Sequence, residues 1–264
     1  MHPIAIFGIT GRMGQSLLRA LAETSSLTLS GAVASAGSRR LGEDAAGEGT
    51  PTGVLITSDS ALGIRGASVA VDFSLGSGVA EHALACAAAG VPILVGATGL
   101  DSADREVLAR AAQDIAVLIA PNTSVGVSVA ARLVAMAAAG LGPSYDVEIF
   151  EAHHRLKRDA PSGTALALGE AVAGVRGRRL QDVAVYDRTG QDAPRTSGSI
   201  GFSCLRAGDI VGEHTVTFAA AGERIEIIHR ATDRMTFARG ALRAAEWLVG
   251  RPAGLYDMQN VLGL

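Results

Sequence analysis

Cysteine is scarce in this chain, which has two among its 264 residues. Cys86 belongs to an alanine-rich stretch of helical character and Cys204 to a stretch of strand character. Nothing around either residue matches the spacing of a metal site or a redox motif. We therefore expect both cysteines to pack in the core, and we expect no metal site.

Charge and long apolar runs are also limited. Charged residues make up 19% of the chain and the net charge is -3, so nothing favours binding to nucleic acid or to an anionic membrane. No apolar run reaches the ~18 residues of a spanning helix. A strand is predicted within four residues of Met1, which leaves no room for a signal peptide, so we expect a cytoplasmic protein. The 48% of hydrophobic residues excludes a disordered chain.

Three glycines spaced three residues apart follow the first predicted strand, residues 4–7. The run is Gly8-Ile9-Thr10-Gly11-Arg12-Met13-Gly14, and leucines at helical spacing come after it. A strand, a glycine loop and a helix form the setting in which a pyrophosphate rests on a helix N-terminus. The spacing differs from G-x-G-x-x-G, so an ordinary tight turn between strand and helix is the alternative.

The second predicted strand, residues 27–33, is followed by cations and hydroxyls. An acid about 20 residues past the glycines normally binds the adenine ribose of NAD. No Asp or Glu lies between Glu23 and Glu43; the loop offers Ser35, Arg39 and Arg40 instead. Because a carboxylate would repel a 2′-phosphate and a guanidinium would bind it, we predict that NADPH is preferred over NADH. Solvated loop charges are the alternative.

Further strands are predicted at residues 54–57, 69–73, 92–95 and 115–119, and helices at 79–89 and 101–112. This alternation predicts a parallel, doubly wound sheet of the α/β class, which binds ligands at the carboxyl ends of its strands. Two loops occupy such ends: Gly96, Ala97 and Thr98, and then Ala120, Pro121, Asn122 and Thr123. Each of these loops is also consistent with an ordinary βα turn.

The pattern changes after a predicted helix at residues 124–139. Strands are predicted at 146–150, 200–205, 213–219 and 224–230 with few helices between them, so we expect a second, α+β domain with an open mixed sheet. We assign residues 206–214 to structure or subunit contact first. We expect His214 and His229 to be satisfied structural histidines, and His82 carries no signal. A last amphipathic helix is predicted at 236–249.

The stretch from Glu151 to Thr164 contains the densest chemistry. Two adjacent histidines, His153 and His154, precede Lys157 on a predicted connection between strand and helix. A histidine exchanges protons near neutral pH, and cations nearby should lower its pKa. Pro161 suits a helix start and Ser162 can cap it, leaving backbone N–H groups that could bind a carboxylate. A solvated basic loop is the alternative.

This stretch closely resembles the E-x-H-H-x-x-K-x-D-A-P-S-G-T-A signature of the dihydrodipicolinate reductase (4-hydroxy-tetrahydrodipicolinate reductase) family, and every fixed position matches. The resemblance implies that His153 and Lys157 are catalytic and that His154, Gly163 and Thr164 bind the substrate's carboxylates. It also implies cofactor contacts at Gly8, Ile9, Thr10, Gly11, Arg12, Met13, Gly96, Ala97, Thr98, Ala120, Pro121, Asn122 and Thr123. Ser35 and Arg39 are predicted as cofactor contacts from the chemistry of their loop, which departs from the Glu-Arg pair of other family members.

The same resemblance implies an organisation and an activity. Residues 1–124 and 234–264 would form a Rossmann-like dinucleotide-binding domain, and residues 125–233 a domain for substrate binding and oligomerisation. The activity would be NAD(P)H-dependent reduction of a cyclic unsaturated imine dicarboxylate in the diaminopimelate route to lysine, by a homotetramer. Another two-domain NAD(P)-dependent amino-acid or oxo-acid dehydrogenase, or a non-catalytic nicotinamide-sensing regulator, remains the alternative.

Overall fold

The computed structural model describes residues 1–264, except for the side chain of Ser77. The chain divides into two compact units, Met1–Val125 with Met235–Leu264, and Gly126–Arg234. The resemblance had implied domain boundaries next to Ser124 and Arg234. No helix in the described chain is both long and apolar enough to cross a membrane.

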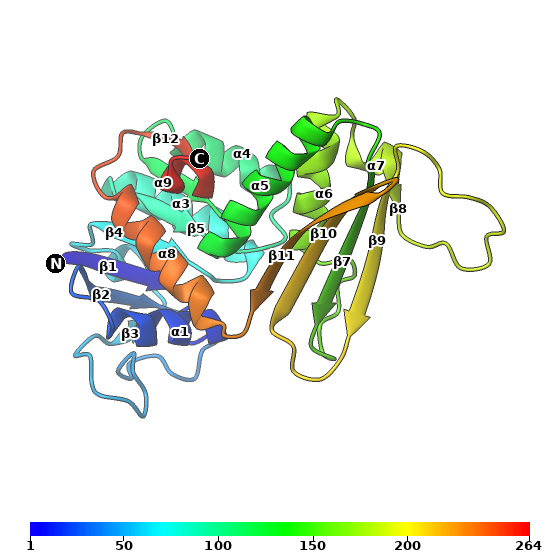
Figure 1. Ribbon diagram of the computed structural model, residues 1–264. Coiled ribbons are helices and arrows are strands. Elements are labelled where there is room, and N and C mark those ends of the chain that lie inside the picture. The colour runs from blue at the N-terminus through cyan, green and yellow to red at the C-terminus, as the bar shows by residue number, and fades with distance from the viewer. The chain divides into compact units, whose positions relative to one another are not determined.

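The first unit is built on a seven-stranded parallel sheet (Figure 1). Its strands in spatial order are β12 (Gly254–Tyr256), β6 (Ala116–Ile119), β5 (Ile93–Val95), β4 (Val69–Asp72), β1 (His2–Phe7), β2 (Leu27–Val33) and β3 (Ile56–Thr57). Successive side chains of a strand point to opposite faces, so Ile4 and Ile6 of β1 pack in one core while Ala5 and Phe7 pack in another. This double burial explains why the strands are short apolar runs.

Helices cover both faces of the parallel sheet. One core includes residues of α1 (Arg12–Leu21), α8 (Met235–Leu248) and α9 (Met258–Leu262). The other includes residues of α3 (Gly76–Ala89) and α4 (Ser102–Ala111), with α2 (Ser60–Gly63) ending beside the buried Ile64. The predicted doubly wound α/β architecture is confirmed. The sequence analysis did not predict the short elements α2, α9 and β12, because three to five residues give no measurable period.

The second unit contains a five-stranded mixed sheet in the order β11 (Glu223–Ala231), β10 (Gly212–Ala220), β7 (Asp146–His153), β9 (Ile200–Arg206) and β8 (Ala184–Val185). Strands β11, β10 and β7 are antiparallel, whereas β7, β9 and β8 are parallel. Figure 1 shows α5 (Val125–Leu141) and α6 (Gly163–Val175) along one face, where they share a core with α7 (Leu180–Val183). The expected open mixed sheet is confirmed.

Two expectations about this sheet were wrong. Strand β7 ends at His153 and not at residue 150, because its last residues still pair with β9 on one side and, up to Ala152, with β10 on the other. Cys204 is exposed, although Cys86 is buried as expected. Burial along β9 ends at Phe202, against whose ring Gly169 of α6 packs, so the rest of the strand has no helix over it in the described part of the chain.

Helix α8 packs closely against the segment that follows β6. Thr123 is buried and its Oγ1 donates to the Phe237 carbonyl over 2.7 Å. One turn along α8, a Cβ built on Gly240 would lie 1.9 Å from the Thr123 carbonyl oxygen. This backbone-to-backbone approach requires glycine.

We therefore predict that Gly240→Ala destabilises the protein by about 1–3 kcal/mol, because overpacking against a fixed carbonyl outweighs the higher helix propensity of alanine. Gly140→Ala is the matched control. It also substitutes a helical glycine, but a Cβ there meets nothing within 4 Å, so stability should stay equal or rise by up to about 1 kcal/mol. Urea unfolding of both variants measures the difference; equal stabilities would contradict the predicted clash.

Candidate active site

The glycine turn after β1 brings three backbone segments into close contact. Gly8 has a φ of +74°, and a Cβ there would lie 2.9 Å from the backbone of Phe73 and of Ser74. A Cβ on Gly14 would lie 2.3 Å from the Gly8 carbonyl oxygen. Helix α1 begins immediately after Gly11, which has no side chain to cap it. The turn therefore presents the first N–H groups of α1 beside a bare backbone, which suits a pyrophosphate.

The other predicted cofactor residues lie at the same edge of the sheet. They follow β2, β5 and β6, whose carboxyl ends are aligned with that of β1 in the parallel sheet. Ser35 and Arg39 are exposed, whereas Arg40 donates to Glu43 and to the Asp44 carbonyl within its own loop. Of the two arginines that the sequence offered here, Arg39 is thus the one directed to solvent.

Several predicted contacts can act only through their backbone. The side chains of Ile9, Ala97, Ala120 and Thr123 are buried. A Cβ on Gly96 would lie 2.3 Å from the Phe73 ring, so this position too is set by close packing. Thr98 and Pro121 are exposed, and Gly11 and Arg12 also lie at the surface.

The sequence analysis missed a buried ionisable pair at this edge. Asp72 ends β4 with no exposed surface; its Oδ1 accepts from Ser74 N over 2.7 Å and its Oδ2 lies 2.8 Å from His82 Nδ1. The His82 ring stacks on Phe7 at 4.1 Å. His82 therefore does have a role, because it holds the turn against which Gly8 packs. No signal in the sequence pointed to this pair, because the nine residues between the two partners carry no motif.

In the second unit, the central group is the carboxylate of Glu151, which has no exposed surface. Its Oε2 lies 2.6 Å from His153 Nδ1 and accepts from Arg206 Nη1 over 2.7 Å. Its Oε1 accepts from Arg206 Nη2 over 2.6 Å and from Ser162 N over 3.0 Å. Burial opposes ionisation, but the hydrogen bonds from Arg206 and His153 outweigh it and lower the pKa of Glu151 to about 2.

His153 lies at the end of β7 and is buried, and burial is the main cause that lowers its pKa. Hydrogen bonding and charge from Glu151 raise this pKa, while the positive charges of Lys157 and Arg206 lower it. The expected effect of the cations is therefore present but smaller than the effect of burial. Arg206 and Glu151 had been given no chemical role from the sequence.

His214 on β10 lies beside this cluster. Its Nε2 is 2.9 Å from Ser162 Oγ, and its ring centroid is 5.2 Å from that of His153. Burial lowers its pKa to about 4, so it is neutral near pH 7. Within the described residues its Nδ1 has no partner, so the expectation of a satisfied histidine holds for one nitrogen only.

The predicted helix start is confirmed. Ser162 is the N-cap of α6, and its Oγ accepts from Ala165 N over 3.2 Å. Gly163 and Thr164 open the helix, and nothing lies within 4 Å of a Cβ built on Gly163. Ordinary cap chemistry thus leaves open space in front of the first turn, where a carboxylate can be bound by backbone N–H groups.

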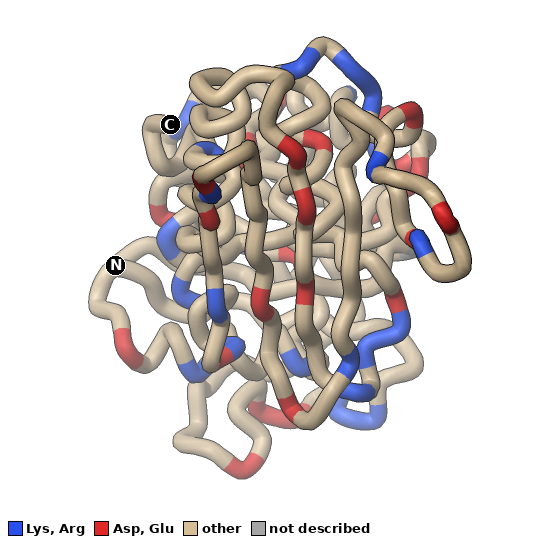
Figure 2. The backbone as a smooth tube through the Cα atoms, turned by 45° about the vertical axis from the view of Figure 1, so that its right-hand side comes forward, with Lys and Arg blue, Asp and Glu red and all other residues tan. Residues whose placement is uncertain are grey.

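The loop after β7 carries the cations and approaches the β9–β10 turn, as Arg155 N donates to the Gly208 carbonyl (Figure 2). Lys157 Nζ lies 2.9 Å from Asp159 Oδ1. A cavity of about 570 Å³ is lined by His154, Arg155, Leu156, Gly208, Asp209 and Arg234. His154 thus lies apart from the Glu151 cluster, in a cavity that it shares with Arg234, a residue that the sequence analysis did not select.

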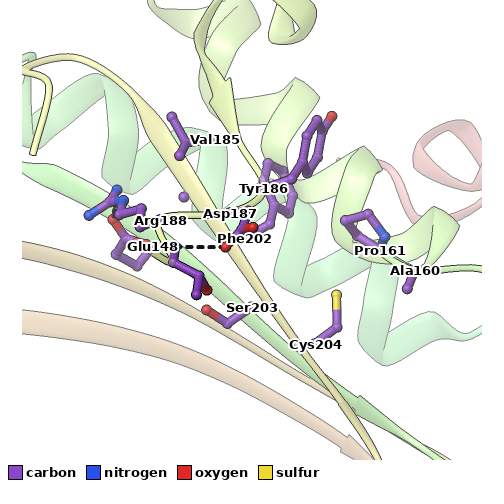
Figure 3. A pocket seen from close by; sticks show the side chains of 12 residues that line it. Glu148, Ala160, Pro161, Val185, Tyr186, Asp187, Arg188, Phe202, Ser203 and Cys204 are labelled. Carbon is purple, nitrogen blue, oxygen red and sulfur yellow. Dashed lines mark hydrogen bonds and ion pairs between the residues drawn. The ribbon is translucent and has the colours of Figure 1, made fainter. Parts of the chain in front are cut away.

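A second cavity, of about 840 Å³, lies between Pro161, the end of β8 and β9 (Figure 3). Glu148 and Arg188 on its wall pair at 2.8 Å. The site residues predicted from the sequence do not line it. Its charged lining residues are Glu148, Asp187 and Arg188, two acids and one cation, so it suits an anionic ligand less well than the cavity lined by Arg155 and Arg234 does.

Comparison with known proteins gives a consistent picture across the whole chain. Residues 2–123 match the model described as dihydrodipicolinate reductase, N-terminus, and residues 126–262 match dihydrodipicolinate reductase, C-terminus. The 4-hydroxy-tetrahydrodipicolinate reductase of Nitrosomonas eutropha is 48% identical over 262 residues, covering 99% of this chain and 98% of the relative. The enzyme of the same name from Herminiimonas arsenicoxydans is 49% identical, with the same coverage.

A solved structure supports the fold independently. The dipicolinate-bound dihydrodipicolinate reductase from Paenisporosarcina sp. TG-14 superimposes with a TM-score of 0.77 at 21% identity, covering 98% of this chain and 99% of that one. The resemblance first seen in the stretch from Glu151 to Thr164 therefore extends over both units. The chain belongs to the dihydrodipicolinate reductase family, whose Rossmann-like fold uses a nicotinamide cofactor.

Proposed function

We propose that the protein catalyses the NAD(P)H-dependent reduction of 4-hydroxy-tetrahydrodipicolinate, a cyclic unsaturated imine dicarboxylate, to tetrahydrodipicolinate in the diaminopimelate route to lysine. The observation that carries the proposal is a buried histidine, His153, hydrogen-bonded to Glu151 beside the open start of helix α6. The relatives of this chain from Nitrosomonas eutropha and Herminiimonas arsenicoxydans are named as enzymes of this reaction. We place the activity in the cytoplasm, where reduced pyridine nucleotides are supplied.

The first unit would hold the cofactor at the carboxyl edge of its sheet. The residues that fit it are Gly8 to Met13 at the pyrophosphate, Ser35 and Arg39 at the adenine ribose, and residues 96–98 and 120–123 towards the nicotinamide. The bare backbone at Gly8 and Gly14 is the observation that supports this fit, because a Cβ at either position would strike the turn. When bound, the reduced nicotinamide supplies a hydride.

The second unit would bind the substrate through its two carboxylates. Backbone N–H groups of Gly163 and Thr164 would bind one carboxylate, and His154 with Arg234 in the cation-lined cavity would attract the other. Lys157 would contribute a further positive charge. A double negative charge on the ligand thus matches the surplus of cations on the loop.

His153 would donate a proton to the ring as it is reduced, with Lys157 assisting. Burial lowers the pKa of His153 and so disfavours the protonated ring in the absence of substrate. A bound dianion would raise this pKa and so increase the fraction that can act as a general acid. Proton donation would therefore be linked to substrate binding.

We further propose a homotetramer assembled through the second unit. Its sheet has α5 and α6 on one face (Figure 1). On the opposite face Phe150, Leu205 and Ile228 are 42%, 42% and 44% exposed. The strand pairings place Thr215 of β10 between Phe150 and Ile228, and Leu205 opposite Ala152, so the three exposed apolar side chains are spread over β7, β9 and β11. Exposed apolar side chains on one face of a sheet are typical of an interface core.

His153→Gln should lower kcat by about 10²–10⁴-fold, the usual contribution of a general acid, and leave NADPH binding nearly unchanged. NADPH oxidation is followed after pyruvate and aspartate semialdehyde have condensed to form the substrate; NADPH binding is measured by fluorescence. His2→Gln is the matched control, because His2 is exposed at the start of β1. A loss of cofactor affinity without a loss of kcat would contradict the role assigned to His153.

Lys157→Ala should instead reduce both kcat and substrate affinity.

The cofactor prediction concerns the loop after β2. We expect kcat/KM to be higher with NADPH than with NADH, and Arg39→Ala to reduce the NADPH value by about tenfold, in line with the loss of a charge-assisted hydrogen bond. The NADH value should stay the same, since NADH has no 2′-phosphate. A clear NADH preference of the unmodified protein would refute the prediction.

Phe150→Glu should convert the tetramer into smaller species, because it places a charge in the centre of the apolar patch. Light scattering after size-exclusion chromatography reports the mass. Val175→Glu is the control: Val175 ends α6 and is 44% exposed, so the same substitution should leave the mass unchanged. A monomeric unmodified protein would rule out the proposed assembly.

A further inference from the structure

Glu151 is a buried carboxylate to which the proposed reaction assigns no direct part. Both of its oxygens are occupied, Oε2 by His153 Nδ1 and Arg206 Nη1, and Oε1 by Arg206 Nη2 and Ser162 N. All four contacts are between 2.6 and 3.0 Å. These contacts come from β7, β9 and the N-cap of α6, and together they fix the carboxylate in place.

The chemistry of this contact determines which nitrogen of His153 carries a proton. An ionised carboxylate only accepts hydrogen bonds, and the low pKa of Glu151, about 2, keeps it ionised. His153 Nδ1, at 2.6 Å, must therefore be the donor. The neutral ring is the Nδ1–H tautomer, and Nε2 is left as the nitrogen that takes up and releases a proton.

A glycine of β10 lies next to Nε2 and adds no side chain there. Gly212, the first residue of β10, lies beside the ring, and a Cβ on it would be 3.1 Å from His153 Nε2. Any larger residue at this position would crowd the nitrogen. The ring is thus held at one nitrogen and given space at the other.

Arg206 fixes the carboxylate and the loop at once. Its two Nη atoms bind the two oxygens of Glu151, and Nη2 also donates to the Asp159 carbonyl over 2.6 Å. Through Ser162 N, the same carboxylate is joined to the N-cap of α6. His153 and the helix start therefore share one rigid support.

We propose that Glu151, clamped by Arg206, is a positioning residue that holds His153 as the Nδ1–H tautomer and presents Nε2 to the reacting dicarboxylate. The presentation of Nε2 to that substrate rests on the proposed function, whereas the control of the tautomer does not. Glu151 also offsets the cations around the ring. The charged and titratable groups that face His153 from other elements are Lys157 on the loop, Arg206 on β9 and His214 on β10, whereas Cys204 on β9 interacts with Glu151.

The direct test is a titration of His153 by NMR with ¹⁵N-labelled histidine, in the full-length protein and in Glu151→Gln. The His153 signal is identified by its absence in His153→Gln. We expect a single dominant Nδ1–H tautomer in the unmodified protein. In Glu151→Gln we expect a mixture of tautomers and a lower pKa for His153, because the amide carries no charge and can either donate or accept.

The kinetic test uses the pH dependence of kcat. A general acid is active only while protonated, so a lower pKa of His153 moves the alkaline fall of kcat to lower pH. Glu151→Gln should show this shift and a loss of kcat on the order of 10²-fold at neutral pH. Glu170→Gln, which removes one exposed carboxylate from α6, is the matched control and should keep the original profile.

Glu151→Asp distinguishes the effect of the negative charge from the effect of side-chain length. The shorter side chain keeps the carboxylate beside Arg206 but moves it away from His153 Nδ1. In Glu151→Asp, His153 should lose its single tautomer, and the pH profile of kcat should shift less than in Glu151→Gln. If circular dichroism shows that Glu151→Gln does not fold, Glu151→Asp provides the test in its place. A tautomer and pH profile like those of the unmodified protein in both variants would overturn the proposal. Absence of turnover by the unmodified protein would refute the proposed function, while the NMR titration would still decide the role of Glu151.

Discussion

An ionised carboxylate without solvent contact is the constraint on which the second unit depends. Burying such a charge costs several kcal/mol unless it is paired and its lone pairs are satisfied. At Glu151, Arg206 provides a bidentate pair, and His153 and Ser162 N fill the remaining positions. Losing any one of these hydrogen bonds would leave the buried charge of Glu151 less well paired, which is energetically unfavourable, so the groups that make them are held in place together. The strand end, the helix cap and the loop between them are consequently one unit of structure.

In the proposed mode of binding, the two units would use different groups: backbone atoms in the first and mainly side chains in the second. In the first, parallel strands bring several loops to one edge, and glycines let those loops approach one another: Gly8 meets Phe73 and Ser74, and Gly14 meets Gly8. The buried Asp72–His82 pair fixes the turn against which they pack. In the second unit, the proposed binding would depend on one helix start and on side chains from neighbouring segments. Backbone recognition suits a dinucleotide, whereas side-chain charges suit a small dianion.

Local patterns in the sequence were sufficient for part of this structure. The spacing of Gly8, Gly11 and Gly14 between a strand and a helix located the turn, and Pro161 with Ser162 located the start of α6. Contacts set by strand register were not accessible. Glu151 and Arg206 are separated by 55 residues and meet because β7 and β9 pair with His153 opposite Arg206. No period within either segment encodes that register. Residues 151–153 were assigned to a loop because polar and small side chains resemble one, although pairing with neighbouring strands makes them strand.

The charges around His153 explain why such a site benefits from an internal carboxylate. Lys157 and Arg206 lower the proton affinity of the ring, as does its burial, and a general acid surrounded by these influences alone would lose its proton too readily. Glu151 opposes them from inside the protein, and Asp159 neutralises part of the loop charge by pairing with Lys157. The remaining positive charge would be compensated only when a dianion binds. A carboxylate fixed within the protein and a charge supplied by the ligand would then act in the same direction, so that the ring holds its proton most firmly in the complex that needs it.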